Sequence, residues 1–279
     1  MTGNDLKNDY FVSKGNPILL REGEIVFEGM TSISAIFHSI AQGICERSIL
    51  RIYFDKERKQ KKEKEYHFLK SQAQNYHFPL ILTDREVLDQ ITTGTTHGGI
   101  VAICTERALP CLQDAVRQEN AVFRKKDGFF VLLEGIEDPY NFGYTLRSLY
   151  AAGVDGVILP PRNWMQAAGI VARSSAGASE QLPMAVAESA DAVQCMHDLG
   201  YRIVCAGIRD SVSMYQADLR LPLLLVVGGE KRGISSTILS QADVITRIDY
   251  GRSFRGSLSA ASAATVLAFE VLRQNGLGE

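Results

Sequence analysis

The sequence predicts an α/β protein built around a parallel sheet, with a small α/β domain in front of it. Short apolar runs alternate with segments of helical length from Asp127 to the C-terminal end. Strands and helices that alternate in this way form a parallel sheet covered on both faces. A shorter alternation, from Glu24 to about Ile103, predicts the small domain, and the polar stretch after it predicts a linker.

We expect four segments along the 279 residues: a flexible tail (1–15), a small α/β domain (16–105), a linker (106–126) and a large domain (127–279). Strands of the small domain are predicted near 25–27, 49–54, 79–82 and 99–103. Thr31 and Asp84 are residue types that cap helices well, so helices are predicted after them. The linker has room for one short helix, near 112–117.

The large domain begins with a buried strand near 129–135. Further strands are predicted near 155–160, 183–187, 201–208, 222–228 and 243–249. Helices are predicted near 141–153, 163–173, 189–199, 234–240 and 257–274.

Composition favours a globular cytoplasmic protein. No apolar run reaches the roughly 18 residues of a membrane-spanning helix, and the polar N-terminal segment lacks the apolar region of a signal peptide. The five cysteines are scattered without CxxC spacing, which predicts reduced thiols and no metal site. The net charge of −2 does not by itself indicate a nucleic-acid partner.

Charge is nevertheless unevenly distributed. Residues 127–279 contain 12 lysines and arginines, and six of these fall in or beside the motifs described next, which suggests an anionic ligand. The alternative is that these are ordinary surface arginines. Residues 55–65 alternate in sign, which is typical of a solvated helix face with i,i+4 pairs but is also compatible with phosphate contacts.

The first motif follows the strand Phe129–Leu133. Asp138-Pro139 ends the extended chain, and a helix begins near Asn141 with Arg147 about one and a half turns further on. An amide and a guanidinium therefore lie at the carboxyl end of a strand, which is where open α/β sheets bind ligands.

Two more motifs end strands of the large domain. An apolar strand to Val227 runs into a turn containing Gly228, Gly229 and Gly233, where a ligand can approach the backbone. A strand ending at Ile248 leads through a loop to Ser257, a good N-cap, and an Ala- and Ser-rich helix that another backbone can approach closely.

Together, the three motifs resemble the SpoU/TrmH group of RNA ribose 2′-O-methyltransferases. They follow one another in the group's order: DPxNxGxxxR, then VGGExxG, then a Ser-Leu loop before an Ala-rich helix. The segment Arg173–Glu180 is similar to the group's Ser/Ala/Gly segment, and residues 24–105 resemble its substrate-binding domain. The resemblance implies the SPOUT class, with a deep trefoil knot near the C-terminus and a homodimer packed through the knot.

The resemblance also implies S-adenosylmethionine as methyl donor and RNA as substrate, with ribosomal RNA favoured over transfer RNA. Matching positions predict catalytic, donor-binding and RNA-binding residues. The catalytic candidates are Asn141, Arg147, Glu230, Ser257 and Ser259; the donor-binding candidates are Val227, Gly228, Gly229, Gly233, Ile248 and Leu258; and the RNA-binding candidates are Arg173, Lys231, Arg252 and Arg255.

These residue types suit methyl transfer to a ribose hydroxyl. Positioning would supply most of the acceleration. Arg147 would stabilise charge on the 2′-oxygen, since a guanidinium with a pKa above about 12 is a poor base. Glu230 would orient Arg147 or Asn141.

The third motif departs from the family pattern. Asp249-Tyr250 replaces Pro-Met, Ser259 replaces asparagine, and Ala261 replaces a serine. Either the chain belongs to a subgroup whose loop uses Arg252, Arg255 and Ser259 to fulfil the role of the usual motif, or it is a non-catalytic RNA- or ribosome-binding factor. The intact Asn141, Arg147 and Glu230 favour the first. A small-molecule methyltransferase is less favoured, because the N-terminal domain would then lack a purpose.

Overall fold

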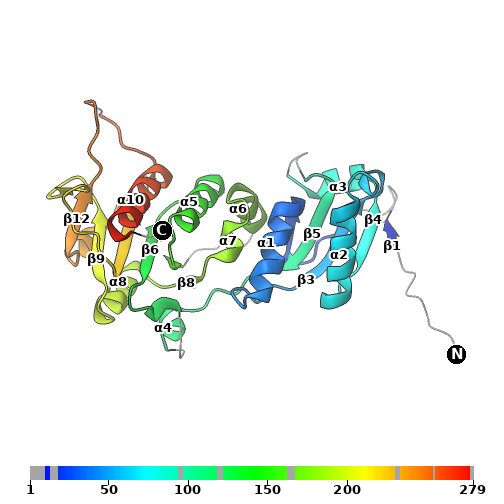
Figure 1. The fold of residues 1–279 in the computed structure, drawn as a ribbon, viewed down its shortest axis with the longest axis horizontal. Helices are drawn as coiled ribbons and strands as arrows, with labels where there is room; N and C mark the ends of the chain where they lie inside the picture. The colour runs from blue at the N-terminus through cyan, green and yellow to red at the C-terminus, as the bar shows by residue number, and fades with distance from the viewer. Residues whose placement is uncertain are drawn as a thin grey trace.

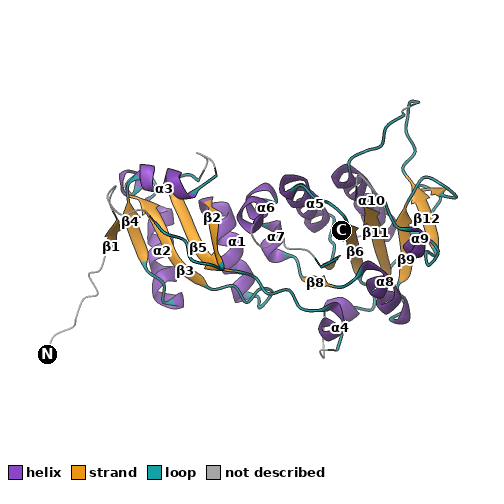
Figure 2. Ribbon diagram, turned by 180° about the vertical axis from the view of Figure 1, so that it is seen from behind, coloured by secondary structure: helices purple, strands orange, loops and turns teal. Residues whose placement is uncertain are grey.

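The computed structural model describes residues 10–12, 18–93, 97–117, 122–161, 167–229, 233–253 and 255–276. Two sheets lie one after the other along the longest axis of the molecule, each with its own helices (Figures 1 and 2). The two alternating patterns of the sequence have therefore become two sheets.

The small sheet has five strands in the order β1-β4-β3-β5-β2. Strands β1, β4 and β3 are parallel, whereas β5 is antiparallel to β3 and β2, so the carboxyl ends of β3 and β4 meet at one edge. The strands are β1 (Tyr10–Val12), β2 (Glu24–Glu28), β3 (Ile49–Asp55), β4 (Leu80–Thr83) and β5 (Ile100–Thr105). Strand β1 lies in the segment that was expected to be a tail.

Three α-helices cover this sheet among the described residues: α1 (Gly29–Ala41), α2 (Glu63–Tyr76) and α3 (Arg85–Ile91). Helix α1 starts at Gly29, whose φ of +79° turns the chain directly out of β2. The cap predicted at Thr31 is therefore wrong, because that residue lies inside the first turn. Helix α3 begins after Asp84 as expected, but the Asp84 side chain makes no capping hydrogen bond.

The large sheet has seven strands in the order β10-β12-β9-β11-β6-β7-β8, and every pairing is parallel, as predicted. The strands are β6 (Phe129–Glu134), β7 (Gly156–Leu159), β8 (Met184–Val186), β9 (Arg202–Ala206), β10 (Val212–Ser213), β11 (Leu223–Gly228) and β12 (Val244–Arg247). The trefoil knot implied by the resemblance stays a prediction.

The helices of this part mostly follow the predicted ranges. They are α4 (Leu112–Ala115), α5 (Pro139–Ala151), α6 (Ala168–Ser174), α7 (Ala178–Gln181), α8 (Ser189–Asp198), α9 (Ser236–Leu239) and α10 (Ala260–Asn275). The start expected for α6, residues 163–166, lies outside the described residues. No helix in the described ranges is long and apolar enough to cross a membrane.

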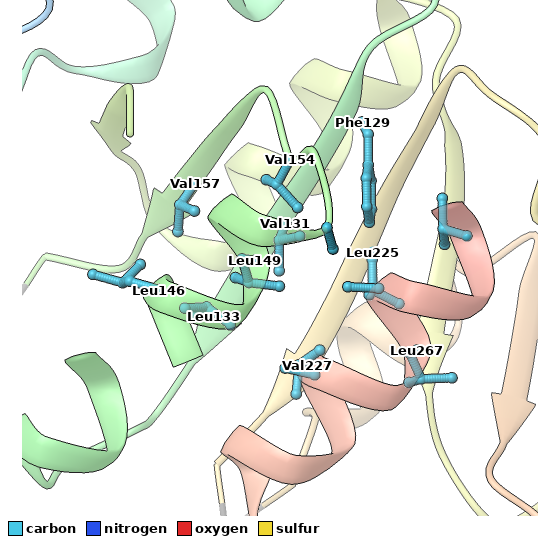
Figure 3. Packing of buried hydrophobic residues seen from close by; sticks show 14 of the residues in the cluster. Phe129, Val131, Leu133, Leu146, Leu149, Val154, Val157, Leu225, Val227 and Leu267 are labelled. Carbon is cyan, nitrogen blue, oxygen red and sulfur yellow. The ribbon is translucent and has the colours of Figure 1, made fainter. Parts of the chain in front are cut away.

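Buried side chains of β6 explain how the large sheet is covered on both faces. Phe129, Val131 and Leu133 point into one hydrophobic cluster with α5 and α10 (Figure 3), whereas Phe130 and Leu132 belong to a second cluster. A strand that is apolar at every position is therefore a strand buried on both sides.

Helices α6 and α7 join the two sheets in a tightly packed seam. A Cβ on Gly169 would lie 2.0 Å from the Val26 carbonyl oxygen, so only glycine allows α6 to approach β2 this closely. Arg47 and Glu180 form a buried ion pair across the seam, with 3.0 Å between Nε and Oε2. The buried Arg107 guanidinium donates to the carbonyl oxygens of Ser179 and Leu182 at 2.7 and 2.9 Å.

Candidate functional site

The edge where β6 and β11 end is built from backbone. Gly228 pairs with Glu134 at the ends of these neighbouring strands. A Cβ on Gly228 would lie 2.4 Å from the Gly233 carbonyl carbon, and a Cβ on Gly229 would lie 2.3 Å from the Gly135 carbonyl oxygen. Main-chain groups therefore come together here with no room for side chains between them.

The donor-binding residues predicted from the second motif share this edge. Val227 is buried in β11, and Gly229 and Gly233 form an antiparallel bridge in which the Gly233 N–H donates to the Gly229 carbonyl at 2.9 Å. Glu230 and Lys231 lie outside the described residues, so their predicted roles stay predictions.

Glu134 is a candidate site residue that the sequence analysis did not name. Its Oε2 atom is buried and has no hydrogen-bond partner among the described residues. Burial raises the pKa of the nearby Cys205 thiol to about 12, and the carboxylates of Glu134 and Asp243 add to that rise. The sequence did contain a signal for this residue: it is an acidic residue at the carboxyl end of an apolar strand, where parallel sheets bind ligands.

Helix α5 carries the first motif beside this edge. Asp138 is its N-cap and accepts a hydrogen bond from the Asn141 N–H at 2.8 Å, with Pro139 at the first helical position. Asn141 is therefore fixed within the first turn, and the Thr145 hydroxyl donates to its carbonyl oxygen at 2.8 Å.

Arg147 lies further along α5 with an exposed side chain. The ion pairs and hydrogen bonds found among the described residues do not include it. Its predicted partner, Glu230, is outside the described residues. An exposed guanidinium near the carboxyl end of a sheet is available to an anionic ligand.

The third motif forms a loop that projects from the body of the molecule between β12 and α10 (Figures 1 and 2). Ile248 packs against the core cluster of α5 and α10. Two of the residues that depart from the family pattern, Asp249 and Tyr250, hold the loop. The Asp249 carboxylate accepts from Ser213 Oγ and pairs with Arg247 at 3.0 Å, and the Tyr250 hydroxyl accepts from the Leu258 N–H at 3.1 Å.

Ser259, rather than Ser257, caps the last helix. The Ser259 Oγ accepts from the Ser262 N–H at 3.2 Å, and α10 starts at Ala260. The cap and the helix start predicted at Ser257 are therefore wrong. Both serines are suitable caps, but only Ser259 is followed directly by the alanines that favour a helix. Ser257 is exposed in the loop.

The predicted RNA-binding arginines do not share one environment. Arg252 and Arg255 are exposed in the loop of the third motif. Arg173 instead lies at the seam, where its guanidinium pairs with the Glu28 carboxylate at 2.9 Å. We found no group of His, Cys, Asp and Glu suited to a metal ion in the parts of the chain that are described.

Comparison with known proteins agrees with this geometry. The SpoU rRNA Methylase family matches residues 128–269, which cover the large sheet and the edge where β6 and β11 end. The chain belongs to this family. A second family, described as RNA 2′-O ribose methyltransferase substrate binding, matches residues 28–110 and so covers the small sheet.

Curated relatives carry related names. The chain is 31% identical over 205 residues, 73% of its length and 81% of the relative's, to the 23S rRNA (guanosine-2′-O-)-methyltransferase RlmB of Shewanella oneidensis. It is 31% identical over 197 residues, 70% of its length and 78% of the relative's, to the putative TrmH family tRNA/rRNA methyltransferase YacO of Bacillus subtilis.

Solved structures share the fold over both sheets. An AdoMet-bound rRNA methyltransferase from Sinorhizobium meliloti superposes with a TM-score of 0.73 at 20% identity, covering 90% of this chain and 88% of the other. The SpoU methyltransferase AviRb from Streptomyces viridochromogenes gives 0.71 at 22% identity, covering 92% and 91%.

Proposed function

We propose that this protein methylates a ribose 2′-hydroxyl of RNA with S-adenosylmethionine as donor, and that the RNA is ribosomal. The observation that carries the proposal is the glycine-only backbone edge at Gly228 and Gly229, beside a helix that presents Asn141 and Arg147. The matching family and the RlmB relative name rRNA alone, whereas YacO names both tRNA and rRNA, which favours ribosomal over transfer RNA as substrate.

The residues at this edge fit S-adenosylmethionine. Main-chain groups around Gly228 and Gly229 would hold its adenosine, as would the Leu258 N–H in the loop. The unpartnered Glu134 Oε2 would accept a hydrogen bond from a donor hydroxyl or ammonium group, which removes the cost of leaving a buried carboxylate oxygen unsatisfied. When bound, S-adenosylmethionine supplies an electrophilic methyl group on a sulfonium.

The chain's own residues would then position and activate the ribose. Asn141, fixed by the Asp138 cap, would hold the ribose near the carboxyl end of β6. Arg147 would stabilise the negative charge that develops on the 2′-oxygen, because its guanidinium stays protonated. Glu230 would orient these groups, and Ser257 and Ser259 would hold the loop that carries Leu258.

The function is tested by calorimetric titration of S-adenosylmethionine and by methyl transfer to ribosomal RNA from cells lacking the protein. Arg147→Ala should lower kcat about 100- to 1,000-fold and leave donor affinity unchanged, whereas Leu258→Trp should abolish donor binding. Arg220→Ala, before the amino end of β11, is the control and should behave as wild type. No donor binding, with or without RNA, would favour the non-catalytic RNA-binding factor.

We propose that two copies associate, as the resemblance implies, and that α5 and α10 of the large domain contribute to the contact. These helices pack on each other and leave large apolar side chains exposed: Tyr140 and Tyr144 on α5, and Phe269 on α10. Exposed aromatic side chains close together are typical of protein interfaces. Light scattering at micromolar concentration should give a dimer, and a monomer would contradict this.

We also propose that the protein acts in the cytoplasm, since all five cysteines are free.

A further inference from the structure

A basic pocket lies at the edge of the small sheet where β3 and β4 end. It has a volume of about 400 Å³ and is lined by Asp55, Glu57, Arg58, Lys61, Lys62 and Arg85. The lining carries more cations than carboxylates, so it is positive overall. The carboxyl ends of parallel strands form the same kind of crevice in the large sheet, where the methyl-transfer site is proposed.

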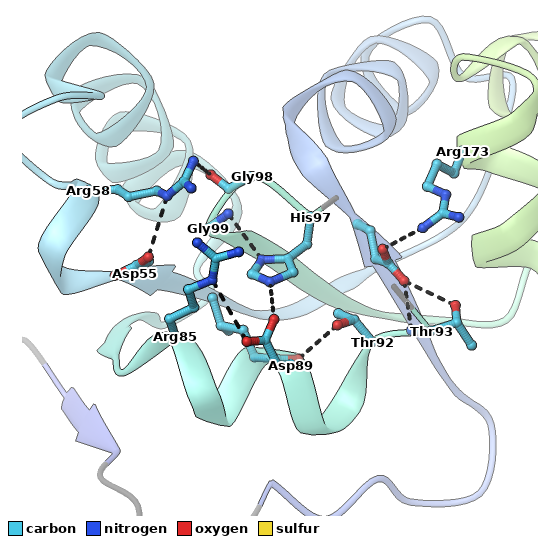
Figure 4. Close-up of polar contacts among 12 residues, drawn as sticks. Asp55, Arg58, Arg85, Asp89, Thr92, Thr93, His97, Gly98, Gly99 and Arg173 are labelled. Atoms are coloured by element: carbon cyan, nitrogen blue, oxygen red, sulfur yellow. Dashed lines mark hydrogen bonds and ion pairs between the residues drawn. The ribbon is translucent and has the colours of Figure 1, made fainter. Parts of the chain in front are cut away.

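A glycine turn lies against Arg58, one of the residues that line this basic pocket (Figure 4). The buried His97 ring lies 2.8 Å from the Asp89 carboxylate through Nε2 and accepts the Gly99 N–H at 3.0 Å through Nδ1. A Cβ on Gly99 would lie 2.7 Å from Arg58 Cδ, and the φ of Gly99 is +83°. The Arg58 stem can therefore lie against the turn only because the residue is glycine.

The cations of the basic pocket are held loosely. Arg58 Nε lies 3.6 Å from the buried Asp55 carboxylate, Lys62 lies 3.9 Å from Glu65, and Arg85 lies 3.7 Å from Asp89. Charge-assisted hydrogen bonds are about 2.7–2.9 Å long, so these ion pairs are weak and leave N–H groups for another anion. The described ion pairs do not include Lys61, which is exposed.

The fold of the charged run gathers these side chains. The sequence left open whether residues 55–65 form a solvated helix face or contact phosphates. In the structure, Lys56–Arg58 form a short 3-10 helix, a turn follows, and α2 starts only at Glu63. The run therefore bends, which brings Arg58, Lys61 and Lys62 to one pocket together with Arg85 from α3.

We propose that the basic pocket binds the phosphodiester backbone of the RNA substrate. Helix α3, which carries Arg85, and the loop of the third motif both lie on the upper side of the molecule in Figures 1 and 2, toward opposite ends of its longest axis. The glycine-packed seam holds the two sheets together, so an RNA that extends along the molecule would meet the two sites in one fixed arrangement. This inference rests on the proposed function and adds the surface that anchors the RNA.

The test measures binding of a fluorescein-labelled 20-nucleotide single-stranded RNA by fluorescence anisotropy at several salt concentrations. The Lys61→Gln/Arg85→Gln double variant removes two cations of the basic pocket. Lys64→Gln/Lys70→Gln is the matched control, since it removes the same charge from exposed positions of α2 that do not line the pocket. Calorimetric titration with S-adenosylmethionine checks that both variants keep the donor site.

We expect the pocket variant to bind RNA at least 10-fold more weakly at 0.1 M salt, with donor affinity unchanged. The slope of log affinity against log salt should become shallower by about 1.4, because each phosphate contact on a single strand contributes about 0.7. The control should lose less than 3-fold.

Equal losses of RNA affinity in the two variants would overturn the pocket proposal, because only the overall charge would then matter. If donor binding and methyl transfer stayed intact in that case, the proposed function would still stand. Displacement of RNA by polyglutamate as effectively as by unlabelled RNA would also overturn it, in favour of an acidic protein partner. A wild-type protein that binds no RNA would overturn the pocket and the proposed function together.

Discussion

The two sheets form their proposed ligand-binding edges in opposite ways. The edge of the large sheet is built from backbone, with Gly228 and Gly229 packed where no Cβ fits. The edge of the small sheet is built from charged side chains around a glycine turn. Donor binding at the edge of the large sheet should therefore be lost when atoms are added, and RNA binding at the edge of the small sheet should be lost when charges are removed.

The largest effect is expected at the seam that fixes these edges relative to each other. Glu180→Ala leaves the Arg47 guanidinium buried without its carboxylate, which should lower the free energy of unfolding by about 3–5 kcal/mol. Urea denaturation measures the change. The exposed pair of Arg220 and Asp218 is the control, and Arg220→Ala should cost less than about 1 kcal/mol. Equal effects of the two substitutions would show that the seam does not hold the sheets together.

Adding one carbon tests the backbone edge. Gly229→Ala places a Cβ 2.3 Å from the Gly135 carbonyl oxygen, and overpacking of this kind should lower the free energy of unfolding by about 1–3 kcal/mol. Calorimetry should show that donor binding is lost even where the protein stays folded. Gly251→Ala, with nothing within 4 Å of its Cβ, should change neither quantity. Normal donor affinity in Gly229→Ala would place the donor elsewhere.

The small sheet should show its dependence on charge in its response to pH. Hydrogen bonds from Arg51 hold the pKa of Glu24 below its usual value of 4.5. The folded protein therefore binds this proton less readily than the unfolded chain, and the stabilisation is present above pH 4.5 and lost as the pH falls through the lowered pKa.

Glu24→Gln should thus lower the free energy of unfolding at pH 7 by about 1 kcal/mol, because it breaks the pair with Arg51. The difference from wild type should shrink between pH 5 and pH 3, as measured by urea denaturation at each pH. A difference that stays constant over this range would mean that the carboxylate contributes no charge effect.

The smallest effect is expected in the loop of the third motif. The Tyr250 hydroxyl accepts the Leu258 N–H that we assign to the donor, so the donor has to displace it. Tyr250→Phe removes this competitor and should tighten donor binding a few-fold, in line with the net value of one hydrogen bond. Weaker binding in calorimetry would mean that Tyr250 holds the loop in its donor-binding form instead.

Local patterns predicted most of the fold. The apolar runs of β6 and β11 and their alternation with helices gave the parallel sheet, because burial on both faces requires such runs. Between two nearby serines that could both cap the last helix, Ser257 and Ser259, the sequence analysis chose the wrong one. The seam was not visible either, since Arg47 and Glu180 are separated by 133 positions and their pairing depends on the packed fold.

The candidate site shows the same limit. Glycines after an apolar strand predicted the backbone edge at Gly228 and Gly229, but which backbone each glycine meets depends on strand order. Glu134 was missed, because its significance comes from burial without a partner. Arg173 was assigned to RNA from its motif, and the sequence could not show that it also pairs with Glu28 of β2.

The glycine-packed seam has a thermodynamic consequence. Ala172 of α6 belongs to the hydrophobic cluster of the small sheet, although its helix follows α5 of the large one. Neither half can lose its structure without exposing part of the other, so heat should melt the chain in one cooperative transition rather than two. A ligand bound to either sheet would then raise the melting temperature of both.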